Sequence, residues 1–329
     1  MYRIGAPLLA AGLFVLAAGC HARTVQGIAA AGLRCVQVLV PSLYFYSVLA
    51  GFAVSSGMLR LTRCLRPLCR VLHLDAELLA VLLFSQIAGY PVGAQLLHGM
   101  YREGRITRAQ EGRLACVCMG AGPGFVLGTV GGVLPPRTAR WLLLSVSLPG
   151  VLLGLVILRG ERTAGAPAGT PPGLAVLLTD AVERAAQAML RICAMVLLFG
   201  ALTALLDPVM PGTLPWRSVL EVSFLTREAL PLPAAAALLA FGGLCVHCQV
   251  AAVCEGALPW GRLLLCRGIC AAGAGVLCYA LLHVFPQALP AAVIPGTAVQ
   301  PSAHPLPGLC LMLMSVLLVL RPGGIRQKR

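Results

Sequence analysis

Long apolar runs separated by short clusters of arginine restrict this chain to one class of fold. Of its 329 residues, 59% are hydrophobic and only 11% are charged, and the mean hydropathy is +0.89. A soluble domain carries about 25% charged residues. A helix needs about 20 apolar residues to cross a bilayer, so the chain has room for roughly eight membrane-embedded segments. The composition therefore predicts an all-α polytopic membrane protein with the lipid bilayer as a partner.

The apolar runs give the expected order of segments along the chain. A basic, amphipathic stretch from Arg60 to Arg70 is expected to lie as a helix in the membrane interface. The apolar segments are residues 4–20, Val36–Met58, Leu78–His98, Leu114–Leu134, Trp141–Leu158, Leu174–Leu206, Ala234–Cys254, Leu263–Phe285 and a last span that ends at Leu320.

The net charge of +14 follows the membrane pattern as well. The basic residues stand at the ends of apolar runs, as the positive-inside rule requires, and the basic C-terminal tail is expected to be cytoplasmic. A nucleic-acid-binding protein would instead gather them on one polar face, so no nucleic-acid partner is expected. The clusters are Arg60–Arg70, Arg102–Arg113, Arg137 with Arg140, Arg159 with Arg162, and Arg321–Arg329.

The patch Gly89-Tyr-Pro-Val-Gly-Ala-Gln95 interrupts the apolar segment Leu78–His98. Lipid cannot satisfy a free backbone, so irregular chain at membrane depth survives only where it is buried in protein or lines a polar cavity. Interrupted helices paired between two halves of a chain indicate a transporter's binding site. The alternative is a packing kink in which glycines let helices approach closely. The candidate solute-binding residues here are Ser85, Gln86, Gly89, Tyr90, Pro91, Gly93 and Gln95.

The segment Leu114–Leu134 is too rich in glycine to form a smooth helix. Either a hairpin that enters and leaves on one side or a broken helix fits this pattern. Gly120, Gly122 and Pro123 are expected to face the first patch and to join the binding site. The run lacks the Lys-Ser/Thr pair of a phosphate-binding loop, so nucleotide binding is not expected there.

A Pro- and Gly-rich linker, residues 159–173, divides the chain into a first half (1–158) and a second half (174–329). The second half also carries an interruption, within Ala234–Cys254. Gly89–Gln95 and Gly243–Gln249 share Gly, Val and Gln at equal spacing, which indicates two related halves. If each half crosses the membrane an odd number of times, the halves form an inverted repeat.

The cluster Cys245-Val-His-Cys-Gln249 has two interpretations. Thiolate and imidazole suit copper(I) or zinc, but the spacing matches no standard ligand pattern, so we expect no metal and no cofactor. His247 and Gln249 are then solute-binding groups, groups that bridge helices, or packing residues. No Ser/His/Asp arrangement and no His-Glu-x-x-His motif occurs in the chain, so an enzyme is not expected.

Several segments, in order, resemble the YlbJ-type sporulation integral membrane proteins, a branch of the nucleoside-recognition (gate) domain membrane family. The resemblance implies kinship with concentrative nucleoside transporters, whose two repeats each carry a re-entrant hairpin and a broken helix. It also implies a spore-forming bacterium, and a place in its cytoplasmic membrane or in the membrane around the forespore. The matching segments are Pro41-Ser42, Arg66–Arg70, Gly89–Leu96, Arg105–Leu114 and Gly122–Gly128.

The resemblance implies transport of a small polar or anionic solute, with dipicolinate during sporulation as the favoured cargo. Tyr90 would bound the solute, Gln95, Gln249 and His247 would hydrogen-bond it, and Arg191 would balance its charge. Family members often have an Asn-rich stretch where this chain has Cys118–Gly122, and Glu and Thr where it has Val246–Cys248. The alternative is a non-transporting gate-domain protein that senses a ligand or scaffolds spore-envelope assembly. Under either interpretation, further copies of this chain or sporulation membrane proteins are expected as partners.

Overall fold

The computed structural model describes residues 2–55, 66–128, 130–164, 173–210, 215–226 and 228–285. Within these ranges the chain is helical and contains no β-strand, which confirms the predicted all-α class. The last expected span, ending at Leu320, and the basic C-terminal tail lie outside the described residues. Among the described residues, five helices are long and apolar enough to cross a membrane: His21–Leu49, Pro136–Leu158, Leu174–Leu206, Leu232–Val253 and Trp260–Val284.

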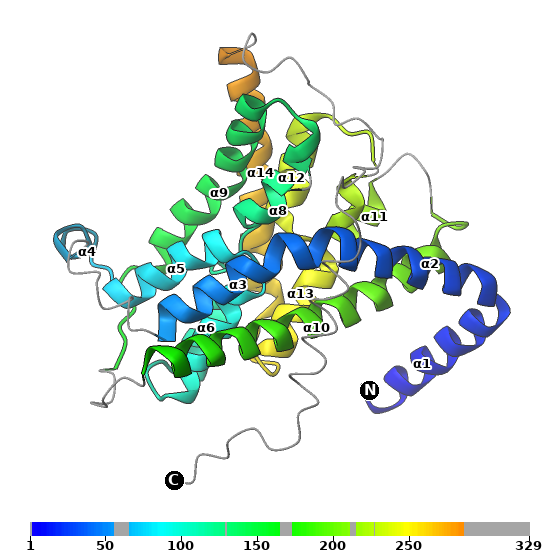
Figure 1. The fold of residues 1–329 in the computed structure, drawn as a ribbon, viewed down its shortest axis with the longest axis horizontal. Helices are drawn as coiled ribbons and strands as arrows, with labels where there is room; N and C mark the ends of the chain where they lie inside the picture. Colours follow the sequence, from blue (N-terminus) through cyan, green and yellow to red (C-terminus); the bar gives the residue numbers. More distant parts are fainter. Residues whose placement is uncertain are drawn as a thin grey trace.

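The chain begins with α1 (Tyr2–Gly19), followed by α2 (His21–Arg34), a short π-helix η1 (Cys35–Leu39) and α3 (Val40–Ser55). The last three run on as one long rod beside α10 (Leu174–Leu206), as Figure 1 shows. Small residues allow this close approach: a methyl group added at Gly27 would lie only 2.6 Å from the carbonyl oxygen of Gly200. Such small-residue contacts are the usual way for membrane helices to pack.

After α4 (Arg66–Leu72), helices α5 (Ala76–Ala88) and α6 (Val92–Arg102) form a hairpin. The predicted interruption is therefore present: Gly89 ends α5 with a φ of +79°, and Tyr90–Pro91 is a cis peptide bond before α6. The two outer ends of the hairpin meet, because Arg105, just after α6, pairs with Glu77 in the first turn of α5. The chain thus enters and leaves this hairpin at the same end.

The segment after the hairpin crosses the molecule, which decides between the two alternatives that the sequence left open for Leu114–Leu134. It runs through α7 (Arg108–Ala115), a non-helical stretch at residues 118–122 that we call the extended segment, α8 (Pro123–Gly128) and the 3₁₀ helix η3 (Val130–Val133) into α9 (Pro136–Leu158). Arg113 in α7 pairs with Glu161 just beyond the far end of α9, at 2.7 Å. Since α9 has 23 residues and spans about 35 Å, the segment before it must cover the same distance. Leu114–Leu134 is thus a broken crossing, and the hairpin lies one segment earlier.

The second half begins with α10, whose bounds are those predicted, and continues through α11 (Trp216–Leu220) and η4 (Val222–Thr226). Helices α12 (Leu232–Phe241) and α13 (Gly243–Val253) are then separated by Gly242, in the left-handed region at φ +92°. They continue as one crossing antiparallel to α14 (Trp260–Val284). A methyl group on Gly275, late in α14, would lie 3.4 Å from the carbonyl oxygen of Pro233, at the start of α12. The aligned patches therefore lie in different settings, one at a hairpin tip and one inside a kinked span.

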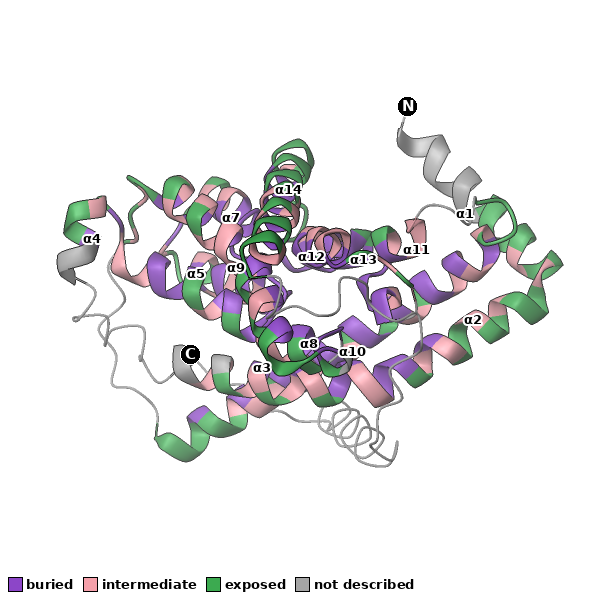
Figure 2. Ribbon diagram, turned by 90° about the horizontal axis from the view of Figure 1, so that it is seen from above, coloured by how far each residue is buried: buried purple, intermediate pink, exposed green. Residues whose placement is uncertain are grey.

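Buried residues concentrate on the hairpin, α12 and α13, while many residues of α2 and α14 are exposed (Figure 2). The outward-facing surface carries large apolar side chains, among them Val156, Leu265 and Val276. An exposed apolar surface of this extent is expected on a protein surrounded by lipid, and it agrees with the five candidate spans.

The first turn of α5 is held by Asp75, which leads to a test of the hairpin's base. Asp75 Oδ1 accepts hydrogen bonds from the backbone N–H groups of Glu77 (2.9 Å) and Leu78 (3.3 Å), and Oδ2 accepts from Thr163. We expect Asp75→Ala to lower the free energy of unfolding by about 1–2 kcal/mol, because an N-cap is lost. Thermal unfolding of the detergent-purified protein measures the effect. Asp75→Asn keeps a capping oxygen and should lose less; equal losses would contradict the capping role.

Candidate functional site

The two helix interruptions meet inside the protein. Tyr90, at the hairpin tip, lies against Gly242 in the α12–α13 kink: a methyl group added at Gly242 would lie 3.5 Å from Cε1 of the tyrosine ring. The Tyr90 side chain is only 6% exposed. We call this meeting point the junction; it consists of the hairpin tip Gly89–Pro91, the kink at Gly242 and the side chains that contact them.

The extended segment Cys118–Gly122 closes one side of the junction. The backbone N–H of Tyr90 donates to the carbonyl oxygen of Gly120 at 2.9 Å. A methyl group on Gly122 would lie 2.9 Å from the nitrogen of Gly89, so glycine is needed for this close approach. The structure therefore brings Gly120 and Gly122 to the first patch, and Pro123 comes next as the first residue of α8.

Arg267 of α14 joins the two halves at the junction. Its side chain is 2% exposed; Nη1 donates to the carbonyl oxygen of Met119 at 2.7 Å, and Nε donates to that of Phe241 at 3.3 Å. Phe241 is the last residue of α12, and carbonyl groups at a helix C-terminus lack intrahelical partners and attract cations. One guanidinium therefore links the extended segment of the first half to the kink of the second.

The arginine selected from the sequence does not lie at the junction. Arg191 is exposed on α10, whereas Arg267 is buried at the junction. The sequence does hold a signal for Arg267, because it is a single charge well inside the apolar run of α14. Charged side chains in such positions almost always face the protein interior and have a functional or pairing role.

Three buried polar atoms around the junction have no hydrogen-bond partner among the described residues: Gln86 Nε2, Tyr90 Oη and His247 Nδ1. The other imidazole nitrogen of His247 contacts the carbonyl oxygen of Phe241 at 3.1 Å, and its ring meets the Phe241 ring edge-to-face. A buried polar group without a partner costs about 1–3 kcal/mol. These atoms are therefore available to a polar solute, and all three belong to residues that the sequence selected.

Other predicted site residues satisfy their polar groups within their own helices. Ser85 donates to the carbonyl oxygen of Leu82 at 2.6 Å, and Gln249 Nε2 donates to Sγ of Cys245 at 3.4 Å. Gln95 is half-buried on α6, and Gly93 packs against Cys118. Among the described residues, no group of three or more His, Cys, Asp or Glu side chains is arranged to hold a metal ion.

An ionic network ties the end of α6 and the start of α7 to the turn after α13. His98 Nδ1 and Glu111 Oε1 are 2.8 Å apart, and Arg108 Nη1 donates to Glu111 Oε2 at 3.0 Å. Arg108 Nη2 also donates to the carbonyl oxygen of Glu255 at 2.9 Å. Arginines of the basic cluster Arg102–Arg113 thus pair with acidic or backbone groups of the chain: Arg108 with Glu111 and Glu255, and Arg113 with Glu161.

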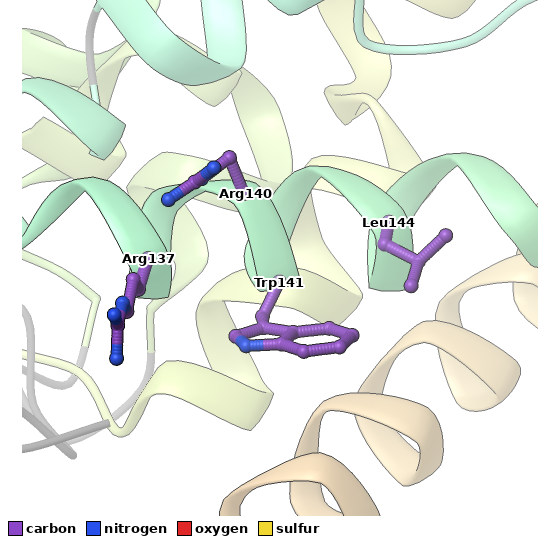
Figure 3. A pocket seen from close by; sticks show the side chains of 4 residues that line it. All are labelled: Arg137, Arg140, Trp141 and Leu144. Carbon is purple, nitrogen blue, oxygen red and sulfur yellow. The ribbon is translucent and has the colours of Figure 1, made fainter. Parts of the chain in front are cut away.

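Two cavities lie away from the junction. The first, about 510 Å³, is lined by Arg137, Arg140, Trp141 and Leu144 at the start of α9 (Figure 3). The second, about 520 Å³, lies between α2 and the end of α10, next to Arg23 and Asp207. Neither is lined by a predicted site residue. The junction itself is closely packed, with the Tyr90 ring buried against Gly242.

Searches for relatives give no family for this chain: no protein-family model, no curated protein and no solved structure matches it.

Proposed function

We propose that this protein is a membrane transporter of a small polar or anionic solute, which binds at the junction of its two helix interruptions. The observation that carries the proposal is the meeting of Tyr90 with Gly242, surrounded by buried polar atoms that lack protein partners among the described residues. Interrupted helices facing one another are the common way in which transporters build a binding site within the membrane. The five candidate spans supply the membrane setting.

The buried guanidinium of Arg267 favours an anion as the cargo. Arginine stays charged and has five N–H donors, of which Nε and Nη1 serve the two carbonyl groups here. A planar carboxylate suits the remaining donors. Together with the resemblance to the YlbJ-type sporulation proteins, this supports dipicolinate, an aromatic dianion, as the probe of choice. Tyr90 and His247 offer an aromatic face and further polar contacts.

Transport would require the hairpin to move against the second half. At the base of the hairpin, Asp75 accepts a hydrogen bond from Thr163 of the linker, and Glu77 pairs with Arg105. At its tip, the backbone N–H of Tyr90 donates a hydrogen bond to the extended segment. The His98–Glu111–Arg108 network would open or close with this motion. In this proposal, residues 1–158 and 174–329 act as two related halves, arranged as an inverted repeat about the junction.

A second candidate function is a non-transporting sensor or scaffold of the spore envelope. The close packing of the junction favours it, because neither of the two cavities described above reaches Tyr90 or Gly242. The two candidates differ in one measurable property, which is solute flux.

The test is saturable dipicolinate uptake into proteoliposomes with Tyr90→Phe, which removes Oη and keeps the ring against Gly242. If Oη binds the solute, we expect the variant to lose about tenfold or more in apparent affinity, since a hydrogen bond to a charged group contributes about 1.5–3 kcal/mol. Tyr279→Phe, on the exposed face of α14, is the matched control and should behave as the wild type. Folded wild-type protein with no flux above empty liposomes would favour the sensor or scaffold.

A further inference from the structure

Glu221, between α11 and η4, is an almost wholly buried carboxylate in the connection from α10 to α12. Glu221 is 2% exposed. Among the described residues, Glu111 is the only other acidic residue that is buried to a similar degree. Glu111 is paired with His98 and Arg108. Glu221 has a more distant cation partner, the Nε atom of Arg34 at 4.0 Å.

Within the described part of the chain, the hydrogen bonds of Glu221 come from Ser223. Oε1 accepts from the backbone N–H of Ser223 at 3.0 Å, and Oε2 accepts from the Ser223 hydroxyl. The nearest cation is Arg34 of α2, whose Nε lies 4.0 Å from Oε2 and whose guanidinium also covers the ring of Phe224. At this separation the pair is an ion contact without a direct hydrogen bond.

The turn that carries Glu221 packs directly on the kink. A methyl group added at Gly243 would lie 3.0 Å from the nitrogen of Val222 and 3.4 Å from the carbonyl oxygen of Leu220. The charged and titratable groups that face Glu221 are Arg34 of α2, Cys35 of η1, Tyr90 of the hairpin tip and Cys245 of α13. The charge on Glu221 therefore acts electrostatically on both the hairpin tip and the kink.

The surroundings of Glu221 disfavour its ionised form. Burial raises the pKa of this carboxyl group above its usual range, while the two Ser223 hydrogen bonds and Arg34 oppose the rise. A buried carboxylate with one cation at 4.0 Å is readily neutralised by a proton. Proton uptake here needs no other chemistry: the carboxylate becomes a carboxylic acid, and its attraction to Arg34 weakens.

We propose that Glu221 carries the coupling proton of this transporter. The inference rests on the proposed transport function. A proton from the more acidic side binds the Glu221 carboxylate, and the neutral side chain releases the turn 221–222 from Arg34 so that the kink can move with the solute. On the other side the proton leaves to water and the ion contact with Arg34 re-forms.

The test separates coupling from transport. Wild-type proteoliposomes should accumulate dipicolinate when the outside is more acidic, and should exchange it across the membrane without a gradient. Glu221→Gln should keep the exchange and lose the gradient-driven accumulation. Glu228→Gln is the matched control, because Glu228 is also an acidic residue with a raised pKa in the same connection but pairs with Ser218; it should accumulate like the wild type.

Each outcome of this experiment bears on one of the two proposals. Two results would overturn the coupling role and leave the transport function intact. One is that the wild type exchanges dipicolinate but does not accumulate it in response to the pH gradient; the other is that Glu221→Gln still accumulates it. Absence of exchange in the folded wild type would overturn the proposed transport function and the coupling role with it.

A second measurement does not depend on flux. With a pKa that is higher in the folded than in the unfolded state, the folded protein binds more protons between the two values. The unfolding temperature of the wild type should therefore rise as the pH falls through the raised pKa of Glu221, and the rise should be smaller in Glu221→Gln. If Glu221→Gln does not fold, Glu221→Asp keeps a titratable group and should shift the pH at which accumulation begins. The same pH dependence in wild type and variant would contradict the proposal.

Discussion

Replacing Gly93 by alanine should destabilise the folded protein by about 3 kcal/mol or more, the upper end of what overpacking costs. A methyl group at this position would lie 1.8 Å from the carbonyl oxygen of Cys118 and 2.6 Å from Cβ of Ser85. The methyl group has no room, because the backbone of Cys118 lies on one side of it and helix α5 lies on the other. The extended segment would have to withdraw from α6, and the hydrogen bond from Tyr90 to Gly120 would be lost with it.

The same helix supplies the control for this prediction. Gly99 lies on α6 with open space around its Cα, so Gly99→Ala should be neutral or stabilise the helix by up to about 1 kcal/mol. Because Cys116 and Cys118 are buried next to the affected contact, a thiol-reactive dye reports unfolding on heating. Equal unfolding temperatures for Gly93→Ala and Gly99→Ala would show that α6 and the extended segment do not touch in the folded protein.

The sequence predicts the helices and their interruptions well because both depend on local chemistry. The apolar run Leu174–Leu206 has the same bounds as α10, and the Gly-Tyr-Pro patch and Gly242 mark the two interruptions. A glycine at positive φ ends a helix, and a proline removes one backbone hydrogen bond from it, so both signals can be recognised in the local sequence.

The direction of the chain after an interruption is not a local property, and here the sequence left it open. Gly89–Pro91 could kink a crossing helix or reverse the chain, and Leu114–Leu134 could be either a hairpin or a broken helix. The direction is set by contacts distant in sequence, such as Glu77 with Arg105 and Asp75 with Thr163. Single-sequence patterns do not contain these pairings.

The candidate site also has residues that could be selected from local sequence and residues that could not. Tyr90, Gly120, Gly122 and His247 were selected from their own segments, and the structure brings them to one junction or its edge. Arg267 and Glu221 were missed because a charge in the sequence does not show which way its side chain points. Arg191 and Arg267 each stand within an apolar stretch, yet one faces outward on α10 and the other is buried in α14.

The largest functional effect is expected from Arg267→Met, because this change should separate binding from folding. Methionine keeps much of the length and adapts its shape, so packing in α14 is largely retained. The variant loses two hydrogen bonds to Met119 and Phe241, but it also removes the cost of burying a charge, which is several kcal/mol. Since these terms oppose each other, the free energy of unfolding should change by only about 1–2 kcal/mol.

For the binding of an anion, no favourable term offsets the loss of the Arg267 charge. Removing one partner of a buried charge pair costs about 2–5 kcal/mol, so the affinity for dipicolinate should fall by roughly 30-fold or more. Equilibrium binding to the detergent-purified protein, next to its thermal unfolding, measures the two effects separately. Arg262→Met, exposed near the start of the same helix, is the matched control and should bind normally. Unchanged affinity in a folded Arg267→Met protein would exclude this guanidinium as the counter-charge, and an anionic cargo would then lose its physical basis.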